Sequence, residues 1–148
     1  FGSGVEEDSL RRYATERNLD NVMFAGRLPN AEMFTILKAA QLSFVSLLNE
    51  KLKDSVPTKM FEALGVGCPI LLSATGDAAD ILAECKLGIA VQPNHDEELW
   101  GAFTKLYSDY DGYIQNSDHA HSVILTRYSR QGAAIILEKY LNMLYTYE

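Results

Sequence analysis

The chain has 148 residues, of which 47% are hydrophobic, which is enough apolar sequence to bury the core of one domain. Its 20 Asp and Glu outnumber its 13 Lys and Arg, so the formal net charge is −7. This excess argues against sequence-independent binding of nucleic acid, which requires clustered positive charge to displace counterions from the phosphates. No apolar run approaches the roughly 20 residues of a membrane-spanning helix.

The first residues predict the end of a strand followed by a helix. The chain begins with Phe1 rather than Met, and we interpret it as a fragment whose preceding part is missing. Gly2-Ser-Gly-Val resembles a shortened dinucleotide-binding fingerprint, but its third glycine is absent and the acids Glu6 to Asp8 open the helix that continues to Arg17. Those acids satisfy the helix dipole and would repel a pyrophosphate, so an oxidoreductase is poorly supported.

The next elements are a predicted strand, a loop and a second helix. Val22-Met-Phe-Ala25 is predicted as a buried strand that ends at Gly26. Arg27-Leu-Pro-Asn30 then forms a loop at the carboxyl end of that strand, where open α/β sheets bind ligands. This loop is one candidate site, and a plain connecting loop with a solvated Arg27 is the alternative.

A helix over 31–40, a strand over 42–47 and an acidic loop over 49–54 are predicted next. The side chains of this helix that we expect to face the core are Met33, Phe34, Ile36 and Leu37.

The most informative stretch runs from Asp54 to Leu71. Ser55 and the following Pro57 predict a helix start, because the first turn of a helix tolerates proline. Gly67 and Pro69 predict the end of this helix, and a short buried strand follows them. The apolar residues Met60, Phe61 and Leu64 recur at helical spacing, and a second side carries Thr58, Glu62 and Gly65.

Two features make this helix a candidate ligand site. Its first turn offers free backbone amides and the positive end of the helix dipole, and Lys59 adds a positive charge there, so a diphosphate would fit. Glu62 lies one turn further on, where a carboxylate can accept hydrogen bonds from paired sugar hydroxyls. The alternative is that Glu62 and Lys59 are ordinary solvated residues, since most helix starts bind nothing.

The remaining sequence continues the alternation of strands and helices. A helix over 75–85, a strand over 88–91 and a helix from Asp96 that carries Leu99, Trp100, Phe103 and Leu106 are predicted, with Trp100 in a structural role. Residues 110–117 are expected to be irregular, and residues 122–147 to form a helix interrupted near Tyr128-Ser129. The order predicts an α/β fold with a doubly wound parallel sheet, Rossmann-like, which binds its ligand at the carboxyl ends of the strands.

The cysteines and histidines give no support for a metal site. Cys68 and Cys85 lie in apolar or helical contexts without the spacing of metal ligands, which is typical of reduced core thiols in a cytosolic protein. His95 stands alone, and the pair His119 and His121 has no third ligand in view. We therefore expect no metal.

The central stretch resembles a known motif. Asp54 and Glu62 stand eight positions apart, and Glu62-Ala-Leu-Gly-Val-Gly-Cys-Pro-Ile follows, which is similar to the acid-x7-Glu motif and the following E-A-x-x-x-G-x-P of retaining glycosyltransferases of family 4, which have the GT-B fold. Val-Pro-Thr-Lys-Met-Phe-Glu resembles the variant P-S/T-K-x-x-E of members that build capsular and other surface polysaccharides. The resemblance covers most of the chain, from Gly2 onward, but its central motif is its specific part.

The resemblance implies a domain organisation and a function. Residues 1–148 would be a single Rossmann-like domain that binds a nucleotide sugar, the C-terminal half of a GT-B fold, without its first strand and helix and without the N-terminal acceptor domain. The full-length enzyme, of hexosyltransferase type, would move a sugar from a nucleoside diphosphate sugar to a glycan or lipid-linked acceptor, without a cofactor or metal. It would act in the cytoplasm, where a lipid-linked acceptor would bring it to the inner face of the membrane, and the fragment alone would be inactive.

The resemblance also implies roles for individual residues. Glu62 would hold the ribose hydroxyls, the amides around Val56 and Thr58 would face the diphosphate, and Asp54 would lie near the transferred sugar as the catalytic residue. The loop after Gly26 would contact the base. The full donor-binding set is Arg27, Leu28, Asn30, Ser55, Val56, Thr58, Lys59 and Glu62.

Two departures from the family pattern and several alternatives accompany this interpretation. The first acid of the motif is usually Glu, and Asp54 is one methylene shorter. The basic Arg and Lys pair of the family would lie upstream of Phe1. The alternatives are half of a GT-B epimerase acting on a nucleotide sugar, a non-catalytic nucleotide-binding module, and an α/β interaction domain without a ligand.

Overall fold

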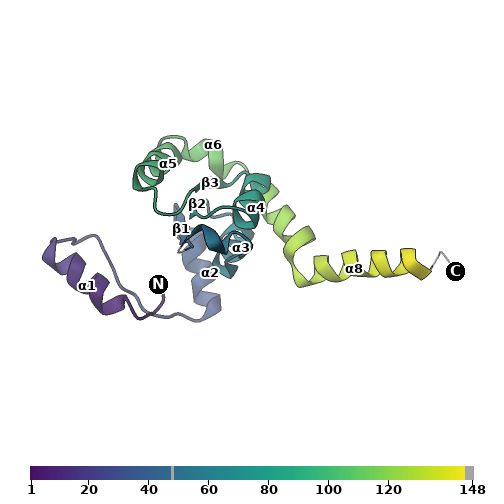
Figure 1. Ribbon diagram of the computed structural model, residues 1–148, viewed down its shortest axis with the longest axis horizontal. Helices are drawn as coiled ribbons and strands as arrows, with labels where there is room; N and C mark the ends of the chain where they lie inside the picture. Colours follow the sequence, from purple (N-terminus) through teal and green to yellow (C-terminus); the bar gives the residue numbers. More distant parts are fainter. Residues whose placement is uncertain (48, 146–148) are drawn as a thin grey trace. The chain divides into compact units, whose positions relative to one another are not determined.

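The computed structural model describes residues 1–47 and 49–145, without the side chains of Asn30 and Glu50 (Figure 1). The chain divides into two compact units, residues 1–35 and residues 36–148, and each is described by itself. The prediction of a single domain over 1–148 stays a prediction.

A parallel sheet organises the second unit. Its strands are β1 (Ser43–Ser46), β2 (Ile70–Ser73) and β3 (Gly88–Val91), in the order β1-β2-β3. In the register of the sheet, Leu72 of β2 lies between Val45 of β1 and Ala90 of β3. All four residues of β2 are buried, as expected for a central parallel strand covered on both faces.

Helices connect the strands and cover both faces of the sheet (Figure 1). The helices are α1 (Glu7–Glu16), α2 (Asn30–Ala39), the 3-10 helix η1 (Glu50–Leu52), α3 (Thr58–Gly65), α4 (Asp77–Cys85), α5 (Asp96–Ser108), α6 (Tyr110–Ile114), α7 (Ser117–Val123), the π-helix η2 (Ile124–Tyr128) and α8 (Arg130–Tyr145). Of these, α3 follows β1, α4 follows β2 and α5 follows β3. The Rossmann-like α/β fold predicted from the sequence is therefore confirmed.

Alternation along β2 produces two hydrophobic layers. Ile70 and Leu72 point to the face covered by α3, α4 and α7, whereas Leu71 points to the other face and packs with Val91 and with Leu106 of α5. Successive side chains of a strand point to opposite faces, so a short apolar run supplies both layers. The sheet is thus doubly wound.

The predicted strand Val22–Ala25 is not formed. These residues have no regular secondary structure, and the side chains of Val22 and Met23 are 45% and 84% exposed. A strand requires a neighbouring chain to accept and donate its backbone hydrogen bonds. Within residues 1–35, the amide of Val22 instead closes a turn onto the carbonyl of Leu19 at 3.3 Å.

Three further expectations were wrong. Residues 110–117 are regular rather than irregular, since residues 110–114 form α6, residues 115 and 116 form a turn, and Ser117 begins α7. Trp100 is 69% exposed and stacks on Phe103 with 5.4 Å between ring centroids, because Ala102 and Leu106 occupy the sheet-facing side of α5. Phe34 of α2 is 42% exposed and does not face a core.

The interruption predicted near Tyr128-Ser129 is confirmed. The π-helix η2 ends at Tyr128, and Ser129 is extended, with ψ 157°. The hydroxyl of Ser129 then accepts a hydrogen bond from the amide of Gly132 at 2.9 Å, which caps the start of α8. A Cβ on Gly132 would overlap the carbonyl of Thr126, so glycine allows this sharp junction. Tyr147, at the end of the predicted helix, lies outside the described residues.

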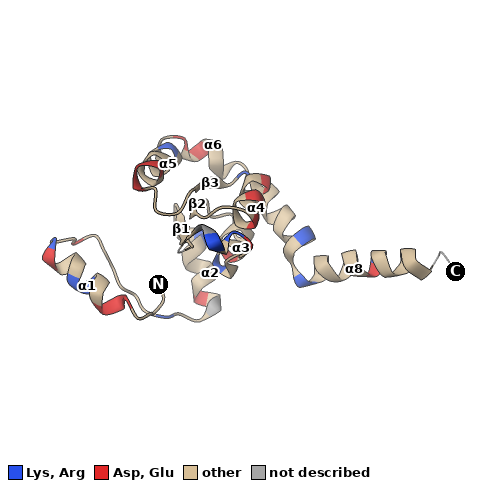
Figure 2. Ribbon diagram, viewed as in Figure 1, with Lys and Arg blue, Asp and Glu red and all other residues tan. Residues whose placement is uncertain are grey.

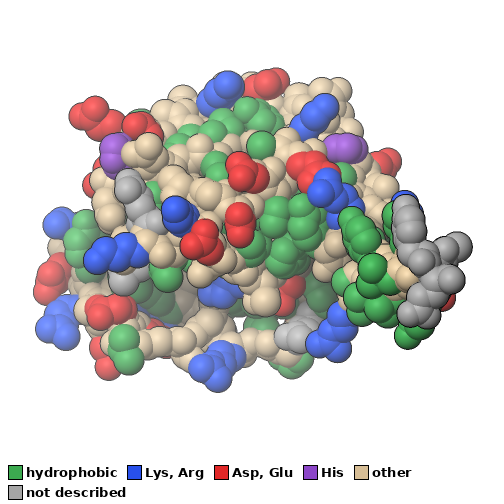
Figure 3. Space-filling model, turned by 45° about the vertical axis from the view of Figure 1, so that its right-hand side comes forward, with side chains coloured by type: hydrophobic (Ala, Val, Ile, Leu, Met, Phe, Trp, Pro, Cys, Tyr) green, Lys and Arg blue, Asp and Glu red, His purple; other side chains and the backbone are tan. Residues whose placement is uncertain are grey.

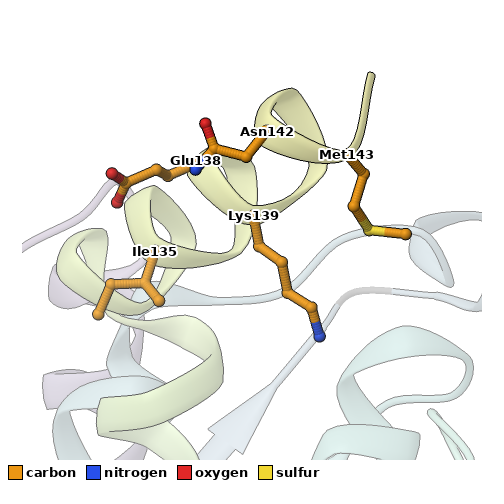
Figure 4. A pocket seen from close by; sticks show the side chains of 5 residues that line it. All are labelled: Ile135, Glu138, Lys139, Asn142 and Met143. Atoms are coloured by element: carbon orange, nitrogen blue, oxygen red, sulfur yellow. The ribbon is translucent and has the colours of Figure 1, made fainter. Parts of the chain in front are cut away.

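Helix α8 carries an apolar surface. Of its residues only Gly132 is buried, and few of its side chains are charged (Figure 2). Hydrophobic side chains gather where this end of the chain comes forward (Figure 3). A shallow hollow of about 440 Å³ lies along the helix, lined by Ile135, Glu138, Lys139, Asn142 and Met143 (Figure 4). Among the described residues, no helix has both the length and the apolar character needed to cross a bilayer.

The two cysteines lie in the core, as predicted, and are free thiols. Burial raises the pKa of the Cys68 thiol to about 11. The pKa of Cys85 is also raised to about 11, mainly by burial and further by Glu84, against the opposing effect of Arg127. Both thiols therefore stay protonated and unreactive in the folded chain at neutral pH.

The raised pKa values of the two thiols predict a loss of stability at alkaline pH. The unfolded chain releases their protons near pH 9.0, whereas the folded chain holds them to about pH 11, so the free energy of unfolding falls as the pH rises through this window. Each thiol contributes at most about 1.4 kcal/mol per pH unit. Urea unfolding at several pH values should show a shallower decline for a variant with Cys68→Ala and Cys85→Ala than for the wild type. Equal slopes for the wild type and the double variant would contradict the prediction.

Candidate functional site

The candidate site lies at the carboxyl edge of the sheet. Because β1, β2 and β3 are parallel, the loops that leave them and the starts of the following helices meet at this edge. The loop after β1 runs through η1 to a turn at Lys53 and Asp54. The side chain of Asp54 is exposed, and the amide of Ser55 closes the turn onto the carbonyl of Leu52 at 2.9 Å.

Helix α3 begins at Thr58, as the sequence indicated to within a few residues. Pro57 is the residue before the first helical turn, with φ −66° and ψ 130°, and no side chain caps the helix, including that of Ser55. Met60 donates its amide to the carbonyl of Pro57 at 3.0 Å. Among the described residues, the amides of Thr58 and Lys59 have no acceptor, so two N–H groups point away from the helix start without a partner.

The far end of α3 fixes the helix in place. Gly67 has φ +77°, and the amides of Gly67 and Cys68 donate to the carbonyls of Leu64 at 3.1 Å and Ala63 at 2.9 Å, the paired bonds of a Schellman motif. Met60, Ala63 and Leu64 are fully buried against the sheet. The helix is thus held along its length, and its free start has a defined position relative to β1 and β2.

The charged side chains of the motif have no partners among the described residues. Glu62 is half-buried, whereas Lys59 and Asp54 are exposed, and none of the three makes a hydrogen bond or ion pair there. Val56 packs against the core and anchors the loop before the helix. The structure therefore brings Asp54, Ser55, Val56, Thr58, Lys59 and Glu62 together in one loop and helix start, with their polar groups available to a ligand.

The three helix starts at this edge differ in charge. Helix α4 has Asp77 and Asp80 in its first turn, and α5 has the three acids Asp96, Glu97 and Glu98. Acidic residues are coloured red on both α4 and α5 in Figure 2. Helix α3 has no acid in its first turn and carries Lys59 there. Of these three, α3 is thus the helix whose dipole is not already neutralised by acids, and it is the one suited to an anion.

Three predicted donor-binding residues belong to the other unit, residues 1–35. Arg27 is exposed and donates from Nε to the hydroxyl of Ser3 at 2.6 Å. Leu28 is half-buried, and Gly26 turns the chain before it with φ +68°. Asn30 begins α2, and its side chain lies outside the described residues. The expectation that this loop contacts the base remains a prediction.

The paired histidines bind backbone carbonyls rather than each other. The Nε2 atom of His119 donates to the carbonyl of Glu84 at 2.9 Å, and the Nδ1 atom of His121 donates to that of Gly65 at 2.5 Å. The carboxylate of Glu84 pairs with Arg127 and accepts from the hydroxyl of Tyr128 at 3.2 Å, which fastens η2 to α4. Across the described residues, no group of three His, Cys, Asp or Glu is placed to hold a metal.

Comparison with known proteins identifies the family. A model of the family described as glycosyl transferases group 1 matches residues 1–122. The chain belongs to this family. No curated protein matches the chain. The matched range includes β1, β2, β3 and helix α3, whereas α8 lies beyond it. Membership in the group 1 glycosyltransferases supports glycosyl transfer as the function, with a nucleotide sugar as donor and a second substrate as acceptor.

One contact of this glycosyltransferase was not predicted from its sequence. The carbonyl of Lys53, beside Asp54, accepts a hydrogen bond from the amide of Asp77 at 3.0 Å, across the gap between the β1 and β2 loops. A backbone carbonyl carries no sequence signal, since any residue supplies one. The sequence feature linked to this contact is Gly76, a glycine that follows a strand. Its position indicates a turn but does not indicate that the turn contacts Lys53.

Proposed function

We propose that this chain is the donor-binding half of a retaining glycosyltransferase, which transfers a sugar from a nucleoside diphosphate sugar to a glycan or lipid-linked acceptor. The observation that supports donor binding best is the acid-free start of α3, with the unpartnered amides of Thr58 and Lys59 beside the ammonium group of Lys59. A diphosphate there accepts hydrogen bonds from both amides and meets the positive end of the helix dipole.

The other residues of the motif have roles that follow from their distance to this anion site. Glu62 lies one turn along α3, and its free carboxylate accepts hydrogen bonds from the two ribose hydroxyls. Asp54 precedes Pro57 in the sequence, whereas Glu62 follows it. In this proposal Asp54 contacts the sugar to be transferred from the exposed turn. We also assign contacts with the base to Arg27, Leu28 and Asn30, on the basis of the resemblance.

The chemistry in this proposal depends on the leaving group. The bond between the anomeric carbon and the diphosphate oxygen breaks, the bond to the acceptor hydroxyl oxygen forms, and the hydroxyl proton passes to the departing diphosphate. Negative charge therefore accumulates on the diphosphate, and the amides and Lys59 at the start of α3 stabilise it. Activity would also require an acceptor-binding domain, so we expect this chain alone to bind donor weakly and to transfer nothing. A role in capsular or surface polysaccharide synthesis and a cytoplasmic location complete the proposal.

Titration with nucleotides tests donor binding. Amide chemical shifts of the isotope-labelled chain are followed by NMR while UDP, GDP or ADP is added to millimolar concentration. We expect one nucleotide to shift the amides of Ser55 to Glu62, and those of Arg27 to Asn30 if that loop contacts the base. Inorganic phosphate is the control for simple anion binding. Absence of shifts at Ser55 to Glu62 with all three nucleotides would contradict the proposal.

A further inference from the structure

The turn between β2 and α4 has a backbone conformation that requires glycine. Gly76 precedes the first residue of α4 and has φ +69° and ψ −142°. For residues with a Cβ this region is strongly disfavoured, and it is essentially restricted to glycine. The following amide, that of Asp77, points out of the turn rather than into the helix.

This turn lies against the loop that carries Asp54. The Asp77 amide donates to the carbonyl oxygen of Lys53 at 3.0 Å. A Cβ on Gly76 would overlap that same oxygen and would lie 2.9 Å from the carbonyl carbon of Lys53, closer than real Cβ atoms approach. The two loops therefore meet backbone to backbone, and the missing side chain of Gly76 makes the contact possible.

We propose that Gly76 is a positioning residue for the donor site, because it lets the β2–α4 turn hold the Lys53–Asp54 turn in place. This inference rests on the proposed function of the α3 start. Gly76 itself does not touch the donor. It acts through the Lys53 carbonyl, and thereby on the side chain of Asp54 and on the path of the chain into Thr58.

The loop between η1 and α3 has few other restraints. Residues 51–55 are exposed, and within the loop the Ser55 amide bonds only to the nearby Leu52 carbonyl. Val56 is the first residue of the loop that packs against the core. Among the described residues, the bond from Asp77 to Lys53 is the tie between Asp54 and the sheet edge, so its loss releases the acid without unfolding α3.

Comparison of two glycine variants tests the inference. Gly76→Ala should displace the Lys53–Asp54 turn, remove the protection of the Asp77 amide from hydrogen exchange, and weaken by about tenfold or more the binding of whichever nucleotide binds the wild type. Gly67→Ala is the matched control, since Gly67 has a similar φ of +77° and a Cβ there would press on Ser117 at the other end of α3. Gly67→Ala should lower the stability of the fold. The affinity of its folded fraction for the nucleotide should equal that of the wild type.

A second pair of variants applies if Gly76→Ala does not fold. Asp77→Pro breaks the contact, because the ring replaces the amide hydrogen and would overlap the Lys53 carbonyl oxygen, but it keeps α4, because proline is favoured at the first position of a helix. Asp77→Ala removes the same side chain and keeps the amide. We expect Asp77→Pro to bind the nucleotide about threefold to tenfold more weakly than Asp77→Ala does, at equal melting temperature.

The outcomes separate this inference from the proposed function. If the wild type binds UDP, GDP or ADP at Ser55 to Glu62 but Gly76→Ala binds it as tightly, or no more weakly than Gly67→Ala, the positioning role is wrong and donor binding stands. Equal affinities of Asp77→Pro and Asp77→Ala would overturn the role as well. If the wild type binds none of the three, both the proposed function and this inference fall.

Discussion

Replacement of Glu62 by alanine is expected to weaken nucleotide binding by about 10- to 100-fold, with little change in stability. The carboxylate of Glu62 has no partner among the described residues, so its removal breaks no internal hydrogen bond. Its proposed bonds to the ribose hydroxyls are charge-assisted, and a hydrogen bond to a charged group contributes about 1.5–3 kcal/mol. Isothermal titration or NMR measures the affinity, and thermal unfolding measures the stability.

Two controls sharpen this test. Glu62→Gln keeps the length of the side chain and one acceptor oxygen, and should bind with intermediate affinity. Glu97→Ala removes an exposed acid from the start of α5, outside the proposed ribose contact, and should not weaken the binding of the nucleotide. A marked fall in melting temperature for Glu62→Ala, with the affinity preserved, would show that Glu62 supports the fold and not the ligand.

Truncation of Leu72 to alanine is expected to destabilise the fold by about 2–5 kcal/mol, the range for a leucine deleted from a closed core. Leu72 is fully buried in β2 between Val45 and Ala90, within the layer that packs on α3 and α4. Such a loss is a large share of the about 5–15 kcal/mol that stabilises a typical domain. Urea unfolding followed by circular dichroism measures it.

The matched control for this prediction is Leu137→Ala. Leu137 lies on α8 and is 60% exposed, so its truncation removes little buried surface and should change the free energy of unfolding by no more than about 0.5 kcal/mol. Equal effects of the two substitutions would mean that β2 does not form the centre of the core.

The elements predicted well from the sequence depend on local chemistry. Gly67 and Pro69 end α3 through backbone preferences that do not depend on the surrounding residues. The strand that follows them was predicted to within a residue or two. The strand predicted at Val22–Ala25 depended on a partner for its backbone, and an apolar pattern cannot supply one. Trp100 was expected to have a structural role, and helical spacing alone does not say which side of α5 the sheet occupies.

The candidate site shows the same division. Asp54 to Glu62 form one continuous segment, so local signals were enough to predict a loop, a helix start and the order of the side chains along them. The start of α3 lacks the acids found at the starts of α4 and α5. This difference in charge matters only once the strands are known to be parallel, because that arrangement brings the three helix starts to one edge. The contact between Gly76 and Lys53 joins two backbones, and the sequence shows only a glycine after a strand, which does not identify its partner.

The placement of acids along this edge also bears on how fast an anion reaches the site. A chain with a net charge of −7 repels a nucleoside diphosphate at long range, and that repulsion is screened beyond about 8 Å in physiological salt. At shorter range the acids that open α4 and α5 continue to repel the anion, whereas Lys59 attracts it. For the proposed donor site we therefore expect salt to lower the repulsion during encounter more than it weakens the final contact. Association of a nucleoside diphosphate should then be faster at high ionic strength, the reverse of the behaviour of a basic phosphate-binding protein.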